Sequence, residues 1–369
     1  MTLERQILVW AIALAAIGYL LYLLGGAVAP FAAGIALGYL LDPVVQRMQA
    51  FGLSRLVASL IILVVFILVV ALLLLTAAPA LAAQFASFAQ KLPGYAMRLQ
   101  ALAVQEGSAL LDRYGGEWRA SGWTISAEQI QKSVGDFVSQ GAQWLLNFLR
   151  SLLSGGAAIF SFLSFLVITP VVAFYMLVDW NKMVATIDGW LPLQHRAALR
   201  AIATEINHAL AGFIRGQSLV CLFLGLWYGL GLTLVGLDFG FLIGVIAGVL
   251  SFIPYVGSLT ALVLSIGVAL VQGWPSLTLF VEALAVVLVG QFLEGNVISP
   301  KLVGGSIGLH PVWLMFALFA FGDLFGFTGL LIAVPAAAAL GVLVRHLIGV
   351  YLKSSLYRGE TGTPTPGAP

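Results

Sequence analysis

Residues 240–273 read GFLIGVIAGVLSFIPYVGSLTALVLSIGVALVQG and contain no charged residue. A helix crosses the hydrocarbon core of a bilayer with about 20 apolar residues, so this stretch is too long for one ordinary span. Pro254 lacks a backbone donor and clashes with the preceding turn of a helix, and Gly257 loosens the chain further. The stretch therefore predicts two half-helices around a break at 253–257.

The rest of the chain is similarly apolar. Of its 369 residues, 61% are hydrophobic and only 9% are charged, and the mean hydropathy is +1.05. A soluble domain carries about 25% charged residues, so the charges here are too few to cover a surface in water. Only helices or closed barrels satisfy the backbone in lipid, and the apolar runs are continuous rather than alternating. We expect an all-α, polytopic helical membrane protein.

About eight hydrophobic segments are predicted, two of them broken or re-entrant. The first exceeds the usual apolar region of a signal peptide, about 7–15 residues, so it is predicted to be retained. Asp42-Pro43 is predicted to end the second segment. The six unbroken segments lie at 7–24, 27–41, 56–78, 157–178, 216–235 and 276–293.

The second broken segment covers residues 310–346 and is interrupted by GDLFG at 322–326. GDLFGFTGL at 322–330 is similar to GLDFGFLIG at 236–244, either by chance or through an internal repeat. Paired segments interrupted by Gly or Pro indicate the substrate site in many transporters. We expect the two breaks to meet near the bilayer midplane. The break residues predicted to line the substrate path are Pro254, Tyr255, Gly257, Gly322 and Gly326.

Basic residues orient the chain in the membrane. Arg5, Arg47 and Arg55 place the N-terminus and the loop after the second segment in the cytoplasm by the positive-inside rule. Lys301 is cytoplasmic if both broken segments are re-entrant hairpins and external if each one crosses fully. The C-terminus is cytoplasmic in both cases, and the rule favours the hairpins.

Charges of both signs appear between residues 80 and 150, and SAEQ at 126–129 has the pattern of a capping box. This region predicts a helical extramembrane subdomain, either a structural insert or a docking domain for a partner. The expected organisation is N-terminal spans at 1–79, this subdomain at 80–152, a span and a cytoplasmic amphipathic helix at 153–211, a transport core at 212–350, and a disordered tail at 351–369.

Small residues recur at four-residue spacing, which lets helix backbones approach closely. These glycines are Gly34 and Gly38, then Gly225 and Gly229, and then Gly236, Gly240, Gly244 and Gly248.

Motifs for enzymatic chemistry are missing. There is no Walker A sequence and no HExxH, the four histidines have no metal-ligand spacing, and Cys221 is the only cysteine. The sequence therefore predicts no enzyme, no cofactor and no metal site, and a net charge of +2 is too small to indicate a nucleic-acid partner.

Polar residues at membrane depth usually face a cavity, pair, or relay protons. Those predicted to couple an ion are Asp323, Glu294, Asn296 and Glu282.

EGNVISPKLVGGSIGLHP at 294–311 resembles the signature of the autoinducer-2 exporter family, also called PerM-like permeases. Four further stretches resemble that family in its order, and Ser258 departs from its usual proline. In these motifs Gln217, Pro300 and Pro311 are predicted to be structural, with both prolines stopping helices. The four stretches are PVVAFYMLVDW at 170–180, GFIRGQSL at 212–219, SFIPYVG at 251–257 and FGDLFGFTGLLIAVP at 321–335.

The resemblance implies a transporter of the bacterial cytoplasmic membrane that assembles as a homo-oligomer. Members of the family are linked to autoinducer-2 export, and some relatives are linked to sodium/proton antiport. With the two broken segments, it predicts an ATP-independent secondary transporter or exporter of a small polar solute, coupled to a proton or sodium. The alternatives are a sodium or lithium/proton antiporter and a non-transporting membrane scaffold built around residues 80–150.

Overall fold

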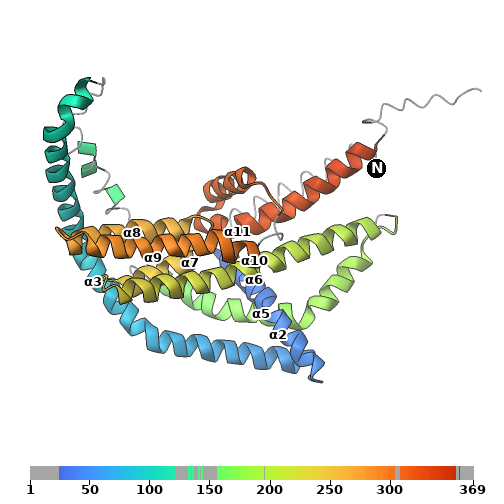
Figure 1. Ribbon diagram of the computed structural model, residues 1–369. Coiled ribbons are helices and arrows are strands. Elements are labelled where there is room, and N and C mark those ends of the chain that lie inside the picture. Colours follow the sequence, from blue (N-terminus) through green and yellow to red (C-terminus); the bar gives the residue numbers. More distant parts are fainter. Residues whose placement is uncertain are drawn as a thin grey trace, which may run out of the picture. The chain divides into compact units, whose positions relative to one another are not determined.

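The computed structural model describes residues 25–120, 156–194, 196–303, 308–354 and 357, with scattered positions between 132 and 143. These residues form helices and no strand, and seven helices among them are long and apolar enough to cross a membrane (Figure 1). The prediction of a polytopic helical membrane protein is confirmed. The predicted span at 7–24, most of the predicted helix at 126–153 and the tail from 358 lie outside the described residues.

The chain divides into two compact units, each built from segments that are far apart in the sequence. The terminal unit comprises Met1–Leu60, Ile168–Gly216 and Pro300–Pro369, and the central unit comprises Ile61–Val167 and Gln217–Ser299. The division by consecutive segments given above stays a prediction.

The terminal unit contains α2 (Gly25–Ala50) and most of α5 (Gly156–Gly189), which pack closely. A Cβ on Gly34 would lie 2.6 Å from Val172 Cβ, and one on Gly38 would lie 2.9 Å from Met176 Cβ. The small-residue prediction is therefore confirmed for this pair of glycines.

The prediction that Asp42-Pro43 ends the second segment is wrong, because α2 continues through both residues to Ala50. Val45, two residues beyond the proline, is fully buried. Packing of the continued helix therefore outweighs the cost of an internal proline, about 3 kcal/mol.

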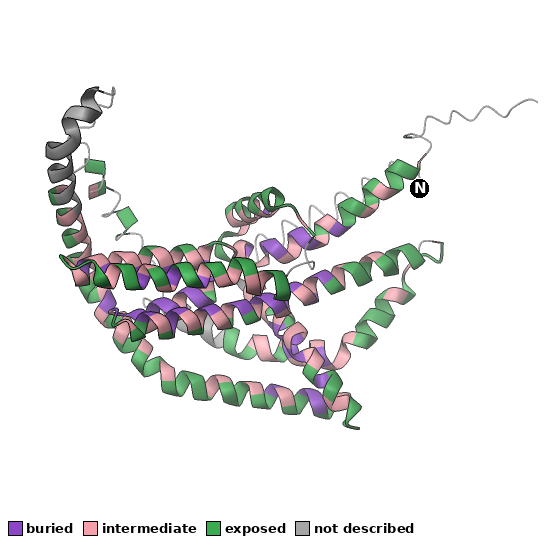
Figure 2. Ribbon diagram, in the orientation of Figure 1, coloured by how far each residue is buried: buried purple, intermediate pink, exposed green. Residues whose placement is uncertain are grey.

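Helix α3 (Arg55–Ala120) lies mostly in the central unit and is much longer than the predicted span at 56–78. Pro79 and Pro93 lie inside it, and Figure 1 shows the helix changing direction along its length, as internal prolines cause. Its first part exposes many large apolar side chains, Leu68, Leu72 and Leu75 among them (Figure 2). Such a surface suits contact with lipid tails.

Helix α6 (Arg196–Leu234) joins the predicted cytoplasmic amphipathic helix and the predicted fifth span into one element. Its central-unit part packs against α7 (Gly240–Leu250) through glycines. A Cβ on Gly244 would overlap the Gly229 backbone, and one on Gly248 would overlap that of Gly225. This confirms close packing for both pairs, whereas Gly236 has a φ of 79° and no atom within 4 Å of its Cβ position, so it serves a turn.

The first predicted interruption is confirmed. Helix α7 ends at Leu250, α8 (Val256–Gly273) begins after five intervening residues, and the two pack on each other as a hairpin. The turn is tight, because Tyr255 adopts a φ of 69° and a Cβ on Gly257 would collide with Ser251. The 11 residues of α7 extend about 16 Å, half of the hydrocarbon thickness, so α7 is too short to cross alone.

The second predicted interruption lies within α11 (Pro311–Lys353), at Gly326. Its φ of 60° and ψ of −140° belong to a region that essentially only glycine adopts. A Cβ on Gly329 would collide with the Phe321 carbonyl, and one on Gly322 would lie 2.9 Å from the Leu330 side chain. The chain therefore folds back on itself here, and this segment is also a hairpin.

The two proline predictions in the motif at 294–311 are wrong. Helix α9 (Thr278–Leu293) continues through the π-helical segment η1 (Glu294–Ile298) into α10 (Ser299–Leu302), so Pro300 lies inside a helix. The wider π turn directly precedes this proline, whose nitrogen has no hydrogen to donate to the preceding turn. Pro311 begins α11 instead of stopping a helix, as a proline at the first helical position does.

We expect Gly244→Ala to destabilise the protein by about 1–3 kcal/mol, because the added methyl group must push the α6 and α7 backbones apart. Thermal unfolding in detergent, followed by tryptophan fluorescence, measures this. The matched control is Gly94→Ala in α3, where a Cβ meets no atom within 4 Å. That control should be neutral or stabilised by up to about 1 kcal/mol. Equal melting temperatures for the two variants would contradict the close approach.

Candidate functional site

The predicted site residues are divided between the two units. Glu282, Glu294, Asn296 and the first break belong to the central unit, while Asp323, Gly322 and Gly326 belong to the terminal unit. The central unit supplies the more detailed geometry, because its break, η1 and α6 are connected by described contacts. The convergence of the two breaks stays a prediction.

The first break is held by a buried glutamine. Gln217 on α6 is 6% exposed, and its Nε2 donates a hydrogen bond to the Ser251 carbonyl at the end of α7. The Ser251 hydroxyl donates to the Ala247 carbonyl at 2.7 Å. The Ala247 carbonyl also accepts a hydrogen bond from the Ser251 N–H at 2.8 Å, so it is paired without the hydroxyl. The last carbonyls of a helix have no partner within it, so the bond from Gln217 satisfies one that a break in lipid would otherwise leave unpaired. Gln217 was predicted to be structural, and its hydrogen bond to the Ser251 carbonyl is the contact that suits this role.

The same α6 motif meets the 294–311 motif one residue earlier. A Cβ on Gly216 would collide with the Leu302 carbonyl at the end of α10, so both backbones are in contact within the terminal unit. Stretches that are separated in the sequence thus pack against one another, which explains why small and polar residues occur at these positions.

Glu294 is the first residue of η1 and is half-buried. A π-helical segment inside a longer helix is rare and frequently marks a functional site. The charge of the Glu294 carboxylate acts on two α6 side chains, the Cys221 thiol and the Tyr228 hydroxyl. Glu294 takes part in no ion pair within the described part of the chain.

Tyr228 is the one residue of this group that the sequence prediction missed. It is completely buried, and no described group forms a hydrogen bond with its hydroxyl. A Cβ on Gly290 would lie 2.5 Å from Tyr228 Cε1 and 2.9 Å from Cζ, so the ring edge that carries the hydroxyl rests on α9 one turn before Glu294. The available signal was the spacing of Gln217, Cys221 and Tyr228, which places three polar side chains on one face of α6.

Three other predicted ion-coupling residues have simpler surroundings. Glu282 and Asp323 are exposed in their helices. Asn296 donates from Nδ2 to the Phe292 carbonyl at 3.0 Å, which is a bond within its own helix. Glu294 is therefore distinguished from these three by its half-buried carboxylate and its polar neighbours.

The start of α7 is held by α3. Asp238, just before α7, accepts a hydrogen bond from the Tyr95 hydroxyl at 3.1 Å and pairs with Lys91 at 3.4 Å. Its backbone N–H donates to Gln272 Oε1 at 2.8 Å. These contacts connect α3, the turn before α7 and the end of α8.

The next residue strengthens this connection. Phe239 adopts a φ of 61°, its ring packs at 5.2 Å from that of Phe88, and Lys91 lies 5.4 Å above it. Gln84 Oε1 accepts a hydrogen bond from the Leu242 N–H at 3.1 Å, within the first turn of α7. Part of the region predicted to be an extramembrane subdomain thus packs directly on the first hairpin.

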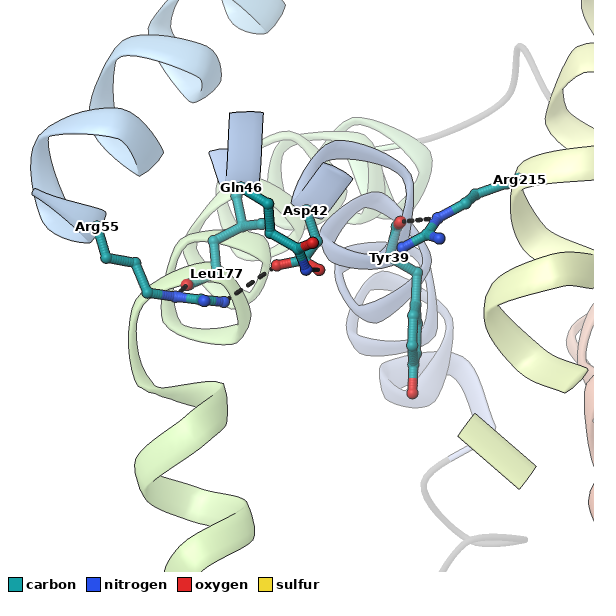
Figure 3. Close-up of polar contacts among 6 residues, drawn as sticks. All are labelled: Tyr39, Asp42, Gln46, Arg55, Leu177 and Arg215. Carbon is teal, nitrogen blue, oxygen red and sulfur yellow. Dashed lines mark hydrogen bonds and ion pairs between the residues drawn. The ribbon is translucent and has the colours of Figure 1, made fainter. Parts of the chain in front are cut away.

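Polar contacts also hold the terminal unit together (Figure 3). Arg55 pairs with Asp42 at 3.0 Å and donates from Nε to the Leu177 carbonyl, while Arg215 donates from Nε to the Tyr39 carbonyl at 2.9 Å. The acid predicted to end the second segment therefore binds the first residue of α3.

Among the residues that the structure describes, no group of three or more His, Cys, Asp or Glu side chains could hold a metal ion.

Comparison with known proteins finds one family. The profile of the family described as "AI-2E family transporter" matches residues 8–349. The chain is 28% identical over 323 residues to the "Putative transport protein YrrI" of Bacillus subtilis, covering 86% of each chain. It is also 28% identical over 328 residues to the "Putative permease PerM" of Escherichia coli, covering 88% of each chain.

Replacing Gln217 with methionine preserves side-chain volume but removes the donor for the Ser251 carbonyl. We expect a loss of about 1–3 kcal/mol in the free energy of unfolding, because that carbonyl is buried. Thermal unfolding in detergent provides the measurement. Gln90→Met is the matched control, since Gln90 is exposed on α3, and it should change stability by at most about 0.5 kcal/mol. A Gln217→Met protein as stable as this control would refute the anchoring role.

Proposed function

The chain belongs to the AI-2E transporter family, and on this premise we propose that it is an ATP-independent secondary transporter that exports a small polar solute, such as autoinducer-2. The protein is a multi-span membrane transporter; the substrate, the direction and the energy source are the proposal. The observation that carries it is the pair of helical hairpins, each broken within an otherwise apolar segment, at Ser251–Tyr255 and at Gly326.

Broken helices favour transport of a polar solute for a physical reason. Irregular backbone at membrane depth is tolerated only where it is buried in protein or lines a cavity with water. At the first break Gln217 satisfies the Ser251 carbonyl, and Tyr255 is exposed in the same turn. We assign the remaining backbone groups of this turn, with Pro254 and Gly257, to the substrate path. Gly322 and Gly326 have the corresponding role in the second hairpin.

The coupling ion is assigned to acidic side chains. A charge at membrane depth is costly, so such residues usually serve a pathway, a partner or a proton relay. Glu294 is the first choice because it is half-buried, lies in a π segment and follows by one turn Gly290, against which the buried Tyr228 ring packs. Asp323 is the second choice, because it lies three residues before the turn of the second hairpin. Glu282 and Asn296 have no comparable surroundings and are not assigned a coupling role.

We place the protein in the bacterial cytoplasmic membrane with both termini in the cytoplasm. The short α7 and the folded-back α11 favour re-entrant hairpins, and this arrangement puts Lys301 on the cytoplasmic side. Homo-oligomer formation stays a prediction.

Transport in proteoliposomes tests this function, with autoinducer-2 and sodium as separate probes under an imposed pH gradient. We expect gradient-driven autoinducer-2 flux in the wild-type protein, and loss of its dependence on the gradient in Glu294→Gln. The control is Glu205→Gln, an exposed acid paired with Arg345, which should transport normally. Asp323→Asn tests the second site in the same assay.

The other outcomes separate the alternative functions. Sodium flux driven by protons, without autoinducer-2 flux, would identify an antiporter. A scaffold would be supported if neither flux is observed and if deleting part of residues 80–150 abolishes the function of the protein in cells. That result would overturn the proposed transport.

The sidedness of Lys301 can be measured with a single cysteine at that position in a Cys221→Ser background. We expect impermeant maleimide to label it in inside-out vesicles and not in intact cells. Labelling from outside the cell would mean that each broken segment crosses the membrane fully, and the paired re-entrant arrangement would be abandoned.

A further inference from the structure

The central unit contains a buried hydroxyl whose position beside Glu294 has a use beyond packing. Tyr228 is completely buried, and no described residue forms a hydrogen bond with its hydroxyl. An unpaired hydroxyl in an apolar interior costs roughly 1–3 kcal/mol, and phenylalanine would fill the same space without that cost. The hydroxyl therefore has a partner in some state of the molecule.

The contacts of the ring identify this partner. The ring edge rests on Gly290 in α9, and Glu294 follows four residues later, one helical turn further on. The Glu294 charge acts on the hydroxyl, so both groups lie within electrostatic range. Trp227 fixes the α6–α9 spacing beside them, because its Nε1 donates to the Val286 carbonyl at 3.0 Å.

We propose that Tyr228 and Glu294 form a one-proton site, in which the phenol donates a hydrogen bond to the ionised carboxylate and positions it. A small rotation of the Glu294 side chain completes the bond. Uptake of one proton from water neutralises the carboxylate and removes the main attraction for the phenol. The site thus alternates between a bonded, charged form and a released, neutral form. This inference rests on the coupling role proposed for Glu294.

The chemistry of the site selects a proton over a metal cation. Hard cations take about six or more oxygen ligands. Among the described residues no group of three or more His, Cys, Asp or Glu side chains could hold a metal ion, and the Cys221 thiol, on which the Glu294 charge acts, is a soft donor. A single carboxylate is sufficient to bind a proton, and the phenol sets the pH at which it does so.

Few other groups influence this titration. On α6 the charge of Glu294 acts on the titratable side chains of Tyr228 and Cys221. Helices α7 and α8 contain no titratable residue. On the helix that carries Glu294, the ionisable side chains of Glu282 and Lys301 are exposed. Changes at Tyr228 should therefore affect Glu294 directly.

Infrared difference spectroscopy of the full-length protein in lipid tests the proposal without any transport substrate. The carbonyl stretching band of a protonated carboxylic acid should titrate in the wild-type protein and be absent from Glu294→Gln. In Tyr228→Phe we expect the pH midpoint of that band to move up by roughly 1–2 units, because the ionised carboxylate loses its donor. Tyr175→Phe, which changes an exposed tyrosine, should leave the midpoint unchanged.

A second variant keeps the test decisive if Tyr228→Phe is poorly folded. Incorporating 3-fluorotyrosine at position 228 alone makes the phenol a stronger donor, so the midpoint should move down, whereas incorporation at the exposed Tyr175 should leave it unchanged. An unchanged midpoint in both variants would overturn the Tyr228 assignment. A shifted midpoint in a protein that transports neither solute nor sodium would retain the proton site and reject the proposed function.

Discussion

A backbone carbonyl at a helix break has no water to bind inside a lipid bilayer, and this protein supplies a side-chain donor instead. Gln217 satisfies the last turn of α7, so the chain can turn at Ser251–Tyr255 without leaving that group unpaired. The bond requires α6 and α7 to lie close together, and facing glycines make this possible. The broken hairpin, the glycine contacts and the buried glutamine are therefore one structural solution to a single constraint.

The opposite end of the same hairpin depends on α3. Two contiguous residues, Asp238 and Phe239, receive an ion pair, a tyrosine hydroxyl and an aromatic ring from α3. An element that continues far past its membrane span thereby determines where α7 begins. Its long apolar part faces outward, whereas its next part carries the polar and aromatic groups that hold the hairpin.

Composition and residue spacing were sufficient to predict the helical membrane fold, both breaks and most glycine contacts, because each follows from a local rule. Lipid admits only helices or closed barrels, and continuous apolar runs indicate helices. Each break was predicted from an apolar run that is too long for one span and contains proline or glycine. The errors at Pro43, Pro300 and Pro311 arose where local rules compete with packing. Pro43 is retained because Val45 is buried beyond it, and Pro300 because a π turn precedes it. Tyr228 was missed because its spacing from Gln217 and Cys221 shows a shared face of α6 but not the helix against which that face packs.

The π segment also affects the helix beyond it. Ala283, Val287 and Gly290 form the buried stripe of α9, and in a regular helix the same stripe would continue through Glu294 to Lys301. One additional residue in a turn rotates everything beyond it by about 100° around the axis. Lys301 is exposed. The irregular turn thus leaves the half-buried acid in line with the buried stripe of α9, while the residues that follow it begin on another face of the helix.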